Sequence, residues 1–280
     1  MDIITTAAGM QQRSREWRRA GRRIGFVPTM GALHEGHLAL VRRARERSDA
    51  VAVSIFVNPT QFGPNEDFAR YPRPFERDAE LCRAAGADAV FHPGVEEMYA
   101  PDASTWVTEE RLSRGLCGAA RPGHFRGVCT VVARLFNLVQ PDLAVFGEKD
   151  AQQLRVIRRM VRDLGFPVEI VSHPIVREPD GLAMSSRNRY LSPEERRQAL
   201  CLRRALDAVL ARHTAGEREA AALRAVLRAA IAAEPGARLD YAEVVDDETL
   251  EPVARCDRPC LALLAVFIGR TRLIDNTRLD

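Results

Sequence analysis

The first 175 residues alternate short apolar runs with amphipathic segments. Apolar runs rich in Val, Ile, Phe and Ala predict buried strands, and apolar positions at helical spacing predict helices between them. The predicted strands are residues 25–29, 50–57, 87–91, 143–146 and 168–171, with short ones within 1–22 and at 105–108. The predicted helices are residues 11–20, 38–47, 76–85, 128–139 and 152–164. Strand–helix–strand units are right-handed and parallel, so this pattern predicts an α/β domain with a parallel sheet.

The pattern changes beyond residue 175. Residues 193–233 are rich in Ala, Leu, Arg and Glu and predict two helices separated near 214–216. Three apolar stretches follow and predict strands of an antiparallel group, at 239–245, 261–268 and 271–274. Helices followed by such a group indicate an α+β arrangement. We therefore predict two domains, an α/β domain at 1–175 and a smaller α+β domain at 176–280.

Composition narrows the classes of function. The net charge of +3 is small and the arginines are dispersed among acidic residues, which gives nucleic-acid binding little support. No apolar run reaches the roughly 18 residues of a membrane span, and the first residues lack the apolar core of a secretory signal. The sequence therefore predicts a cytoplasmic protein that binds neither nucleic acid nor membranes.

The six cysteines are scattered along the chain, which favours buried free thiols over a disulfide scaffold. Cys256 and Cys260 have a spacing that half of a metal site could have. No second pair of cysteines or histidines follows them, so a metal site is the weaker interpretation.

One basic residue differs from all the others. Among 41 Lys and Arg residues, Lys149 is the sole lysine. Lysine offers a compact, flexible point charge where arginine offers a planar fork, and a phosphate site in tight quarters can require the former. The alternative is that one lysine survived by chance. Lys149 lies just past the predicted strand at 143–146, where the next helix starts, so its position agrees with a role in binding phosphate.

Residues 23–37, RIGFVPTMGALHEGH, predict a strand, a tight loop and the start of a helix. Backbone amides at a helix N-terminus are unpaired and the helix dipole is positive there, so this junction suits phosphate oxygens. His34 and His37 can add imidazole donors to the same oxygens. The alternatives are an incidental pair and a zinc site, for which no third ligand is evident.

Three further loops carry polar residues. Residues 58–67 and 147–153 follow predicted parallel strands, as residues 30–37 do, so all three loops are expected at one edge of the sheet. Residues 184–187 lie where the second domain could close over that edge. Since Asn, Pro and Gly form turns regardless of function, the loop at 58–67 can equally be a plain surface loop.

The groups that these four loops offer to a phosphate are cations and neutral donors. No carboxylate pair is arranged for acid–base catalysis, the Gly-Lys-Ser/Thr ending of a P-loop is missing, and no GxGxxG follows the first strand. Imidazoles, a lysine, hydroxyls and an arginine suit the stabilisation of charge on phosphoryl oxygens during in-line displacement. The nucleophile would then come from the substrate.

Five motifs together resemble the pantothenate synthetase family, the AMP-forming pantoate:β-alanine ligases, within the nucleotidyltransferase superfamily marked by His-x-Gly-His. They are PTMGALHEGH (28–37), SIFVNPTQFGPNEDFARYPR (54–73), RPGHFRGV (121–128), GEKDAQQL (147–154) and REPDGLAMSSRNRYLS (177–192). The resemblance covers nearly the whole chain in order. His-x-Gly-His alone would support only a nucleotidyltransferase.

The resemblance implies a Rossmann-like N-terminal domain, a smaller C-terminal lid domain and a cytoplasmic homodimer. It also implies ATP as co-substrate and Mg²⁺ held mainly by the ATP phosphates, not by side chains. In such enzymes the pantoate carboxylate attacks the α-phosphorus and pyrophosphate leaves. The amine of β-alanine then attacks the pantoyl adenylate to give pantothenate, on the way to coenzyme A, and AMP. A carboxylate is already ionised at neutral pH, so the first step needs no general base.

The resemblance also implies catalytic roles. His34 and His37 would contact the ATP phosphates, with His37 stabilising the leaving pyrophosphate, and Lys149 would neutralise charge at the reacting phosphates. Three residues of the lid would hold the same phosphates: Ser185, Ser186 and Arg187.

Binding roles are implied in the same way. Four residues would contact the nucleoside, two at the ribose and two through their backbone at the adenine: Gly147, Asp150, Val176 and Met184. Met30 would lie beside ATP and also form an apolar wall beside pantoate. The remaining pantoate residues would be Gln61 and Gln153 as hydrogen-bonding partners, and Asn58 as support for the loop.

The sequence departs from the superfamily pattern at two positions, as this family generally allows, and from the commonest family pattern at one. The superfamily's two lid lysines are replaced by Ala183 and Arg187, and a glutamate expected before RPGHF is Cys117. One alternative is a nucleotidyltransferase of the same fold that acts on a phosphorylated substrate, although two glutamines and an apolar Met30 favour a branched acid. A second alternative is a non-catalytic nucleotide-binding regulator.

Overall fold

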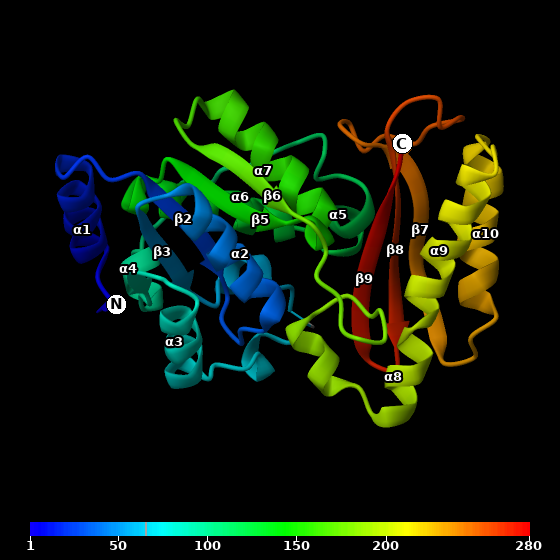
Figure 1. Cartoon of the computed structure of the whole chain (residues 1–280), viewed down its shortest axis with the longest axis horizontal. Coiled ribbons are helices and arrows are strands. Elements are labelled where there is room, and N and C mark those ends of the chain that lie inside the picture. The colour runs from blue at the N-terminus through cyan, green and yellow to red at the C-terminus, as the bar shows by residue number, and fades with distance from the viewer. Residues whose placement is uncertain (65) are drawn as a thin grey trace. The chain divides into compact units, whose positions relative to one another are not determined.

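The computed structural model describes residues 1–64 and 66–280 and has two compact units (Figure 1). The first unit comprises Met1–Ser113, Arg121–Glu148 and Gln153–Pro174, and the second comprises Arg114–Ala120, Lys149–Gln152 and Ile175–Asp280. The predicted division into domains at 1–175 and 176–280 stays a prediction. Asn65, part of the predicted loop at 58–67, lies outside the described residues.

The described residues of the first unit form a six-stranded parallel sheet in the order β1-β4-β3-β2-β5-β6. The parallel α/β fold expected from the sequence is thereby confirmed. From β2 the chain adds β3 and β4 on one side and β5 and β6 on the other, so the strand order reverses between β2 and β5. The strand bounds are β1 Asp2–Ile4, β2 Ile24–Thr29, β3 Ala50–Ile55, β4 Ala89–Phe91, β5 Leu143–Gly147 and β6 Glu169–His173.

Helices cover both faces of this sheet. Val27 of β2 belongs to the apolar cluster beneath helix α2, whereas the neighbouring Phe26 meets Phe136 of helix α6 with ring centroids 6.4 Å apart. Side chains alternate along a strand, so α2 and α6 lie on opposite faces. The helix bounds are α1 Ala7–Arg19, α2 Glu35–Arg47, α3 Phe75–Ala84, α4 Val95–Met98, α6 His124–Val139 and α7 Ala151–Leu164.

The second unit contains a three-stranded antiparallel sheet, β7-β8-β9, packed against helices (Figure 1). Its core joins the apolar faces of α9 and α10 to the central strand β8. The predicted α+β arrangement is confirmed. The bounds are α5 Leu116–Ala120, α8 Pro193–Ala199, α9 Cys201–Thr214, α10 Ala220–Ala232, β7 Ala237–Asp246, β8 Cys260–Ile268 and β9 Thr271–Leu279.

Three predicted elements differ from the structure by more than small shifts of their ends. Residues 105–108 form no strand, because the amide of Val107 bonds the Thr130 hydroxyl at 3.0 Å and not a neighbouring strand. The helix predicted after residue 193 is two helices, α8 and α9, separated at Leu200. The last strand continues beyond residue 274 to Leu279, through polar residues that include the buried Asp275. Throughout residues 1–64 and 66–280, every helix is too short or too polar to cross a membrane.

Candidate active site

Three of the four predicted loops follow neighbouring strands of the parallel sheet. Met30 follows β2, Asn58 lies three residues beyond β3, and Gly147 is the last residue of β5. These strands are adjacent and parallel, so their carboxyl ends meet at one edge. Ligands of open α/β sheets bind outside that edge where the strand order reverses, which here is the position between β2 and β5. The fold therefore places the loop that carries the two histidines at its natural ligand site.

A buried carboxylate holds the turn between β2 and α2. Gly31 and Ala32 have φ of 79° and 51°, so the chain reverses through the left-handed region. The amides of Ala32 and Leu33 donate to the two carboxylate oxygens of Asp78, at 2.6 and 2.9 Å. Asp78, on α3, is 0% exposed. This contact fixes the backbone that leads into the histidine pair.

His34 and His37 lie together at the start of α2. His34 is the N-cap, with φ of −138° and ψ of 174°, and the two ring centroids are 4.1 Å apart. The amide of His34 donates to Nδ1 of His37 at 3.3 Å. Because Nδ1 is the acceptor in this bond, a neutral His37 carries its proton on Nε2. His37 therefore has a donor nitrogen on the side of the ring away from the helix cap.

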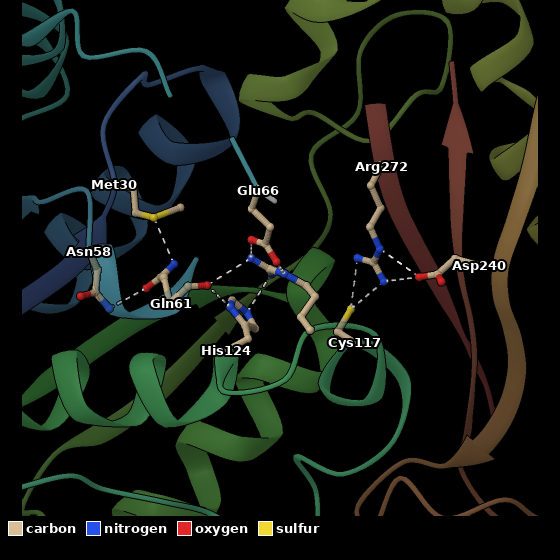
Figure 2. Close-up of polar contacts among 9 residues, drawn as sticks. Met30, Asn58, Gln61, Glu66, Cys117, His124, Asp240 and Arg272 are labelled. Carbon is tan, nitrogen blue, oxygen red and sulfur yellow. Dashed lines mark hydrogen bonds and ion pairs between the residues drawn. The ribbon is translucent and has the colours of Figure 1, made fainter. Parts of the chain in front are cut away.

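Asn58 and Gln61 are joined by their side chains, as Figure 2 shows. The Tyr99 hydroxyl donates to Oδ1 of Asn58 at 2.8 Å, and Nδ2 of Asn58 then donates to Oε1 of Gln61 at 3.1 Å. Burial raises the pKa of Tyr99, against the lowering effects of Thr60, Arg134 and Asn58, so the hydroxyl keeps its proton. The network orients the Gln61 amide with its oxygen toward Asn58.

The nitrogen of the same amide points toward Met30. Nε2 of Gln61 lies 3.0 Å from the Met30 sulfur, which brings two residues of the predicted pantoate site into contact (Figure 2). A thioether is a weak acceptor, so an oxygen of a ligand could replace it at low cost. The arrangement offers a donor beside an apolar side chain, which suits a branched hydroxy acid.

In the second unit, the loop after β6 is held as a narrow hairpin. The amide of Met184 donates to the Val176 carbonyl at 3.0 Å, which brings together the two residues expected at the adenine. Arg177 pairs with both oxygens of Asp275, at 2.7 and 3.0 Å, and Asp275 is 2% exposed. Beyond the hairpin, the Ser185 hydroxyl accepts from the Arg187 amide at 3.2 Å and caps a short 3-10 helix, Ser186–Tyr190.

Lys149 also belongs to the second unit. It lies in the 3-10 turn Glu148–Asp150, where the Asn276 side chain donates to its carbonyl at 3.0 Å. Lys149 is half-buried and Asp150 is exposed. In the part of the chain that the structure describes, no ion pair engages the Lys149 ammonium. The backbone of Lys149 is thus fixed by Asn276, and its ammonium can bind an anionic ligand.

The predicted residues divide between the units. The structure joins Met30, Asn58 and Gln61 by direct contacts and places His34 against His37. The first unit holds Met30, His34, His37, Asn58, Gln61, Gly147 and Gln153, the last of these in the first turn of α7. The second holds Lys149, Asp150, Val176, Met184, Ser185, Ser186 and Arg187. The functional role of each residue stays a prediction.

The model of the pantoate-beta-alanine ligase family matches residues 2–278. The chain belongs to this family. The resemblance carried by the five motifs is confirmed, and so is the class of enzyme, a ligase. A curated pantothenate synthetase of Thermotoga petrophila is 58% identical over 277 residues, which cover 99% of each chain. One of Acidobacterium capsulatum is 62% identical over 92% of this chain and 86% of its own.

Solved structures agree with this family. A pantothenate synthetase of Thermus thermophilus matches with a TM-score of 0.93 and 51% identity, covering 99% of both chains. The pantoate-beta-alanine ligase of Francisella tularensis, complexed with Beta-gamma ATP and Beta-alanine, matches with a TM-score of 0.81 and 31% identity. That match covers 99% of this chain and 97% of the other.

Cys117, where the common family pattern led us to expect a glutamate, lies in a polar group of the second unit (Figure 2). Its sulfur is 3.6 Å from both terminal nitrogens of Arg272 and 3.4 Å from the Tyr241 hydroxyl. Arg272 also donates to Asp240, at 3.0 and 2.7 Å. Burial, with Cys117 adjacent, raises the pKa of Tyr241 well above its ordinary value. Asp240 therefore supplies a carboxylate to Arg272 without a glutamate at position 117.

Sequence reasoning missed Asp78 and Tyr99 in this site. Asp78 left a weak signal, because it falls beside Ala79 and four residues before Cys82 on the buried stripe of α3, where a charge is unusual. Tyr99 left none, since its contacts with Asn58 and Thr60 span about forty positions of sequence.

Proposed function

We propose that this chain condenses pantoate with β-alanine in an ATP-dependent reaction, through a pantoyl adenylate, and releases pyrophosphate and AMP. Family membership over residues 2–278 supports the two substrates. The Francisella tularensis ligase, solved as a complex with Beta-gamma ATP and Beta-alanine, supports ATP as co-substrate. The observation that carries the proposal is the pairing of Gln61 with Met30 at the sheet edge that also carries the histidine pair.

In the first step, the pantoate carboxylate attacks the α-phosphorus of ATP and pyrophosphate leaves. Nε2 of Gln61 would donate to an oxygen of pantoate, while Met30 excludes water beside its dimethyl carbon. His37 would donate from Nε2 to the departing pyrophosphate, and His34 would contact the same phosphates. These groups stabilise charge and need not remove a proton.

Gly147 of the first unit and several residues of the second unit would supply the remaining contacts with ATP. Lys149 would neutralise the reacting phosphates, and the Val176–Met184 hairpin would lie along the adenine. Other contacts would come from Gly147 and Asp150 at the ribose, and from Ser185, Ser186 and Arg187 at the phosphates, with residues 176–280 acting as a lid. Gln153 would assist Gln61 in holding pantoate.

Mg²⁺ would reach the site on the ATP phosphates, which is how this ion commonly binds in proteins. Within the described residues no three His, Cys, Asp or Glu side chains are grouped as a metal site.

A homodimer and a cytoplasmic location complete the proposal. Both rest on the resemblance to the family, and sedimentation of the purified protein tests the first of them.

Isotope exchange tests the reaction. With ATP and Mg²⁺ present, labelled pyrophosphate should enter ATP only when pantoate is added, and AMP should accumulate with pantothenate only when β-alanine follows. Reactions without pantoate, and with a phosphorylated acceptor such as phosphopantetheine, are the controls. An absence of exchange with pantoate, or exchange that requires the phosphorylated acceptor, would contradict the proposal.

A further inference from the structure

The main-chain carbonyl of Gln61 is held by two side chains that the proposed reaction does not use. Nδ1 of His124 lies 2.9 Å from this oxygen, and Nη2 of Arg121 donates to it at 3.3 Å. His124 is 8% exposed, and it is the first residue of α6. Figure 2 shows His124 beside Gln61, on the opposite side from Met30.

The partners of His124 determine its protonation state. The Gln61 carbonyl can only accept, so Nδ1 carries the proton. Nη1 of Arg121 can only donate, and it lies 3.0 Å from Nε2, so that nitrogen is the acceptor. In this arrangement His124 is therefore a neutral ring. It links Arg121 to the Gln61 carbonyl, because it accepts a hydrogen bond from the first and donates one to the second.

Arg121 is itself fixed by an ion pair with Glu66. Nε and Nη2 of the guanidinium meet the two carboxylate oxygens at 2.8 and 2.5 Å. Only 17% of the Arg121 side chain and 23% of the Glu66 side chain are exposed. A paired, partly buried guanidinium keeps one geometry, so Nη1 is aimed at His124, and Nη2, which also pairs with Glu66, donates to the Gln61 carbonyl.

The first turn of α6 contacts the same segment at two more points. A Cβ at Gly127 would lie 2.3 Å from the Thr60 carbonyl oxygen, so the helix backbone approaches the 3-10 turn Pro59–Gln61 very closely. The Gly127 carbonyl accepts from Nδ2 of Asn58 at 3.2 Å. The backbone of Gln61 is thus set by a helix, while its side chain is set by Asn58.

We propose that His124 and Arg121, with Glu66 fixing Arg121, are positioning residues that place Gln61 for binding the hydroxy acid substrate. The inference rests on the proposed role of Gln61 toward pantoate. His124 and Arg121 act through the Gln61 backbone and touch no reacting atom. Their loss weakens pantoate binding and leaves ATP binding unchanged, because the histidine pair and its turn are held separately by Asp78.

The test compares apparent KM values in pantoate-dependent pyrophosphate exchange. His124→Leu removes the donor at similar volume, and it should raise the KM for pantoate about 3- to 10-fold, the range expected for one net hydrogen bond. The KM for ATP should stay within about twofold. His124→Asn places an N–H near the position of Nδ1 and should recover most of the loss.

A matched control is His92→Leu. Nδ1 of His92 makes the same kind of bond, 2.7 Å to the Ile55 carbonyl, but it does not touch Gln61. This variant should leave both KM values within about twofold of the wild type.

Glu66→Gln is a milder test variant of the same network. It should raise the KM for pantoate about twofold to threefold by loosening Arg121.

The outcomes separate this inference from the proposed function. An unchanged pantoate KM in His124→Leu, an equal rise for ATP, or no recovery in His124→Asn would overturn the positioning role. If the wild-type protein shows no pantoate-dependent exchange, the proposed function fails. Amide hydrogen exchange over residues 58–62 then tests whether His124 holds the backbone of Gln61. His124→Leu should speed this exchange, and an unchanged rate would refute the positioning role.

Discussion

Lys149 is a half-buried cation just past the end of a parallel strand. Its carbonyl is held by Asn276 and its side chain has no ion pair within the described residues. Lys149→Ala should lower kcat on the order of 10²-fold, with a smaller change in the KM for ATP, because the charge acts mainly in the transition state. Steady-state rates of pantothenate formation measure this.

Lys149→Arg is the matched variant for this prediction. It keeps the charge but replaces a point by a planar fork, so it should recover only part of the lost rate. Wild-type turnover in Lys149→Ala would show that the sole lysine of the chain is accidentally placed.

At this scale the sequence indicates candidate residues whose own chemistry suits a phosphate. Lys149 was indicated by composition, and His34 and His37 by their position after a strand. Residues that act through distant contacts were not predictable in the same way. The sequence assigns no role to His124, because its partner Gln61 is 63 positions away and the bond joins it to a backbone carbonyl that any residue would supply.

Among the elements, α6 and the turn Pro59–Gln61 approach each other closely at Gly127. Gly127→Ala should lower the free energy of unfolding by about 1–3 kcal/mol, because the new methyl group would overlap the Thr60 carbonyl and the neighbouring Gln61 amide. Urea denaturation measures the change.

The control for this variant is Gly115→Ala. A Cβ at Gly115 would meet no atom within 4 Å, and Gly115 is not among the glycines with positive φ, so its stability should be close to wild type. If Gly127→Ala were equally harmless, α6 would have room to shift and would be a weak platform for Gln61.

Element prediction succeeded where a segment's own pattern determines its structure. The run 50–57 was predicted as a strand buried on both faces, and β3 is buried at every position. Element prediction failed where contacts with another segment determine the structure. Residues 105–108 are prone to form a strand but have Thr130 in place of a neighbouring strand, and the polar second half of β9 is a strand because β8 pairs with it.

For the whole molecule, the order of strands could be anticipated only in part. Hydrophobic runs and crossover helices indicate a parallel sheet, and the ends of its strands indicate one edge for the loops. They do not indicate that β5 pairs with β2, which creates the reversal beside the histidine turn. That pairing joins residues about 118 positions apart. It is therefore determined by packing between distant segments and not by local sequence pattern.

The scarcity of lysine makes the alkaline stability of the molecule unusually simple to interpret. Burial, the largest cause in each case, raises the pKa of four thiols from 9 to about 11 or 12 in the folded protein: Cys82, Cys129, Cys201 and Cys260. In the unfolded chain these thiols lose their protons near pH 9, whereas the folded chain retains them. The unfolded state then binds fewer protons, so stability falls as the pH rises.

We therefore expect a free energy of unfolding that is constant up to about pH 8.5 and falls steadily toward about pH 11. One lysine and four tyrosines leave few other groups to titrate in this range, and the raised pKa values of Tyr99 and Tyr241 act in the same direction. Urea denaturation at a series of pH values measures the slope. Cys82→Ala removes one thiol and should make the slope shallower, whatever it does to stability at pH 7. A slope identical in the variant and the wild type would mean that this thiol ionises equally in the folded and unfolded chains.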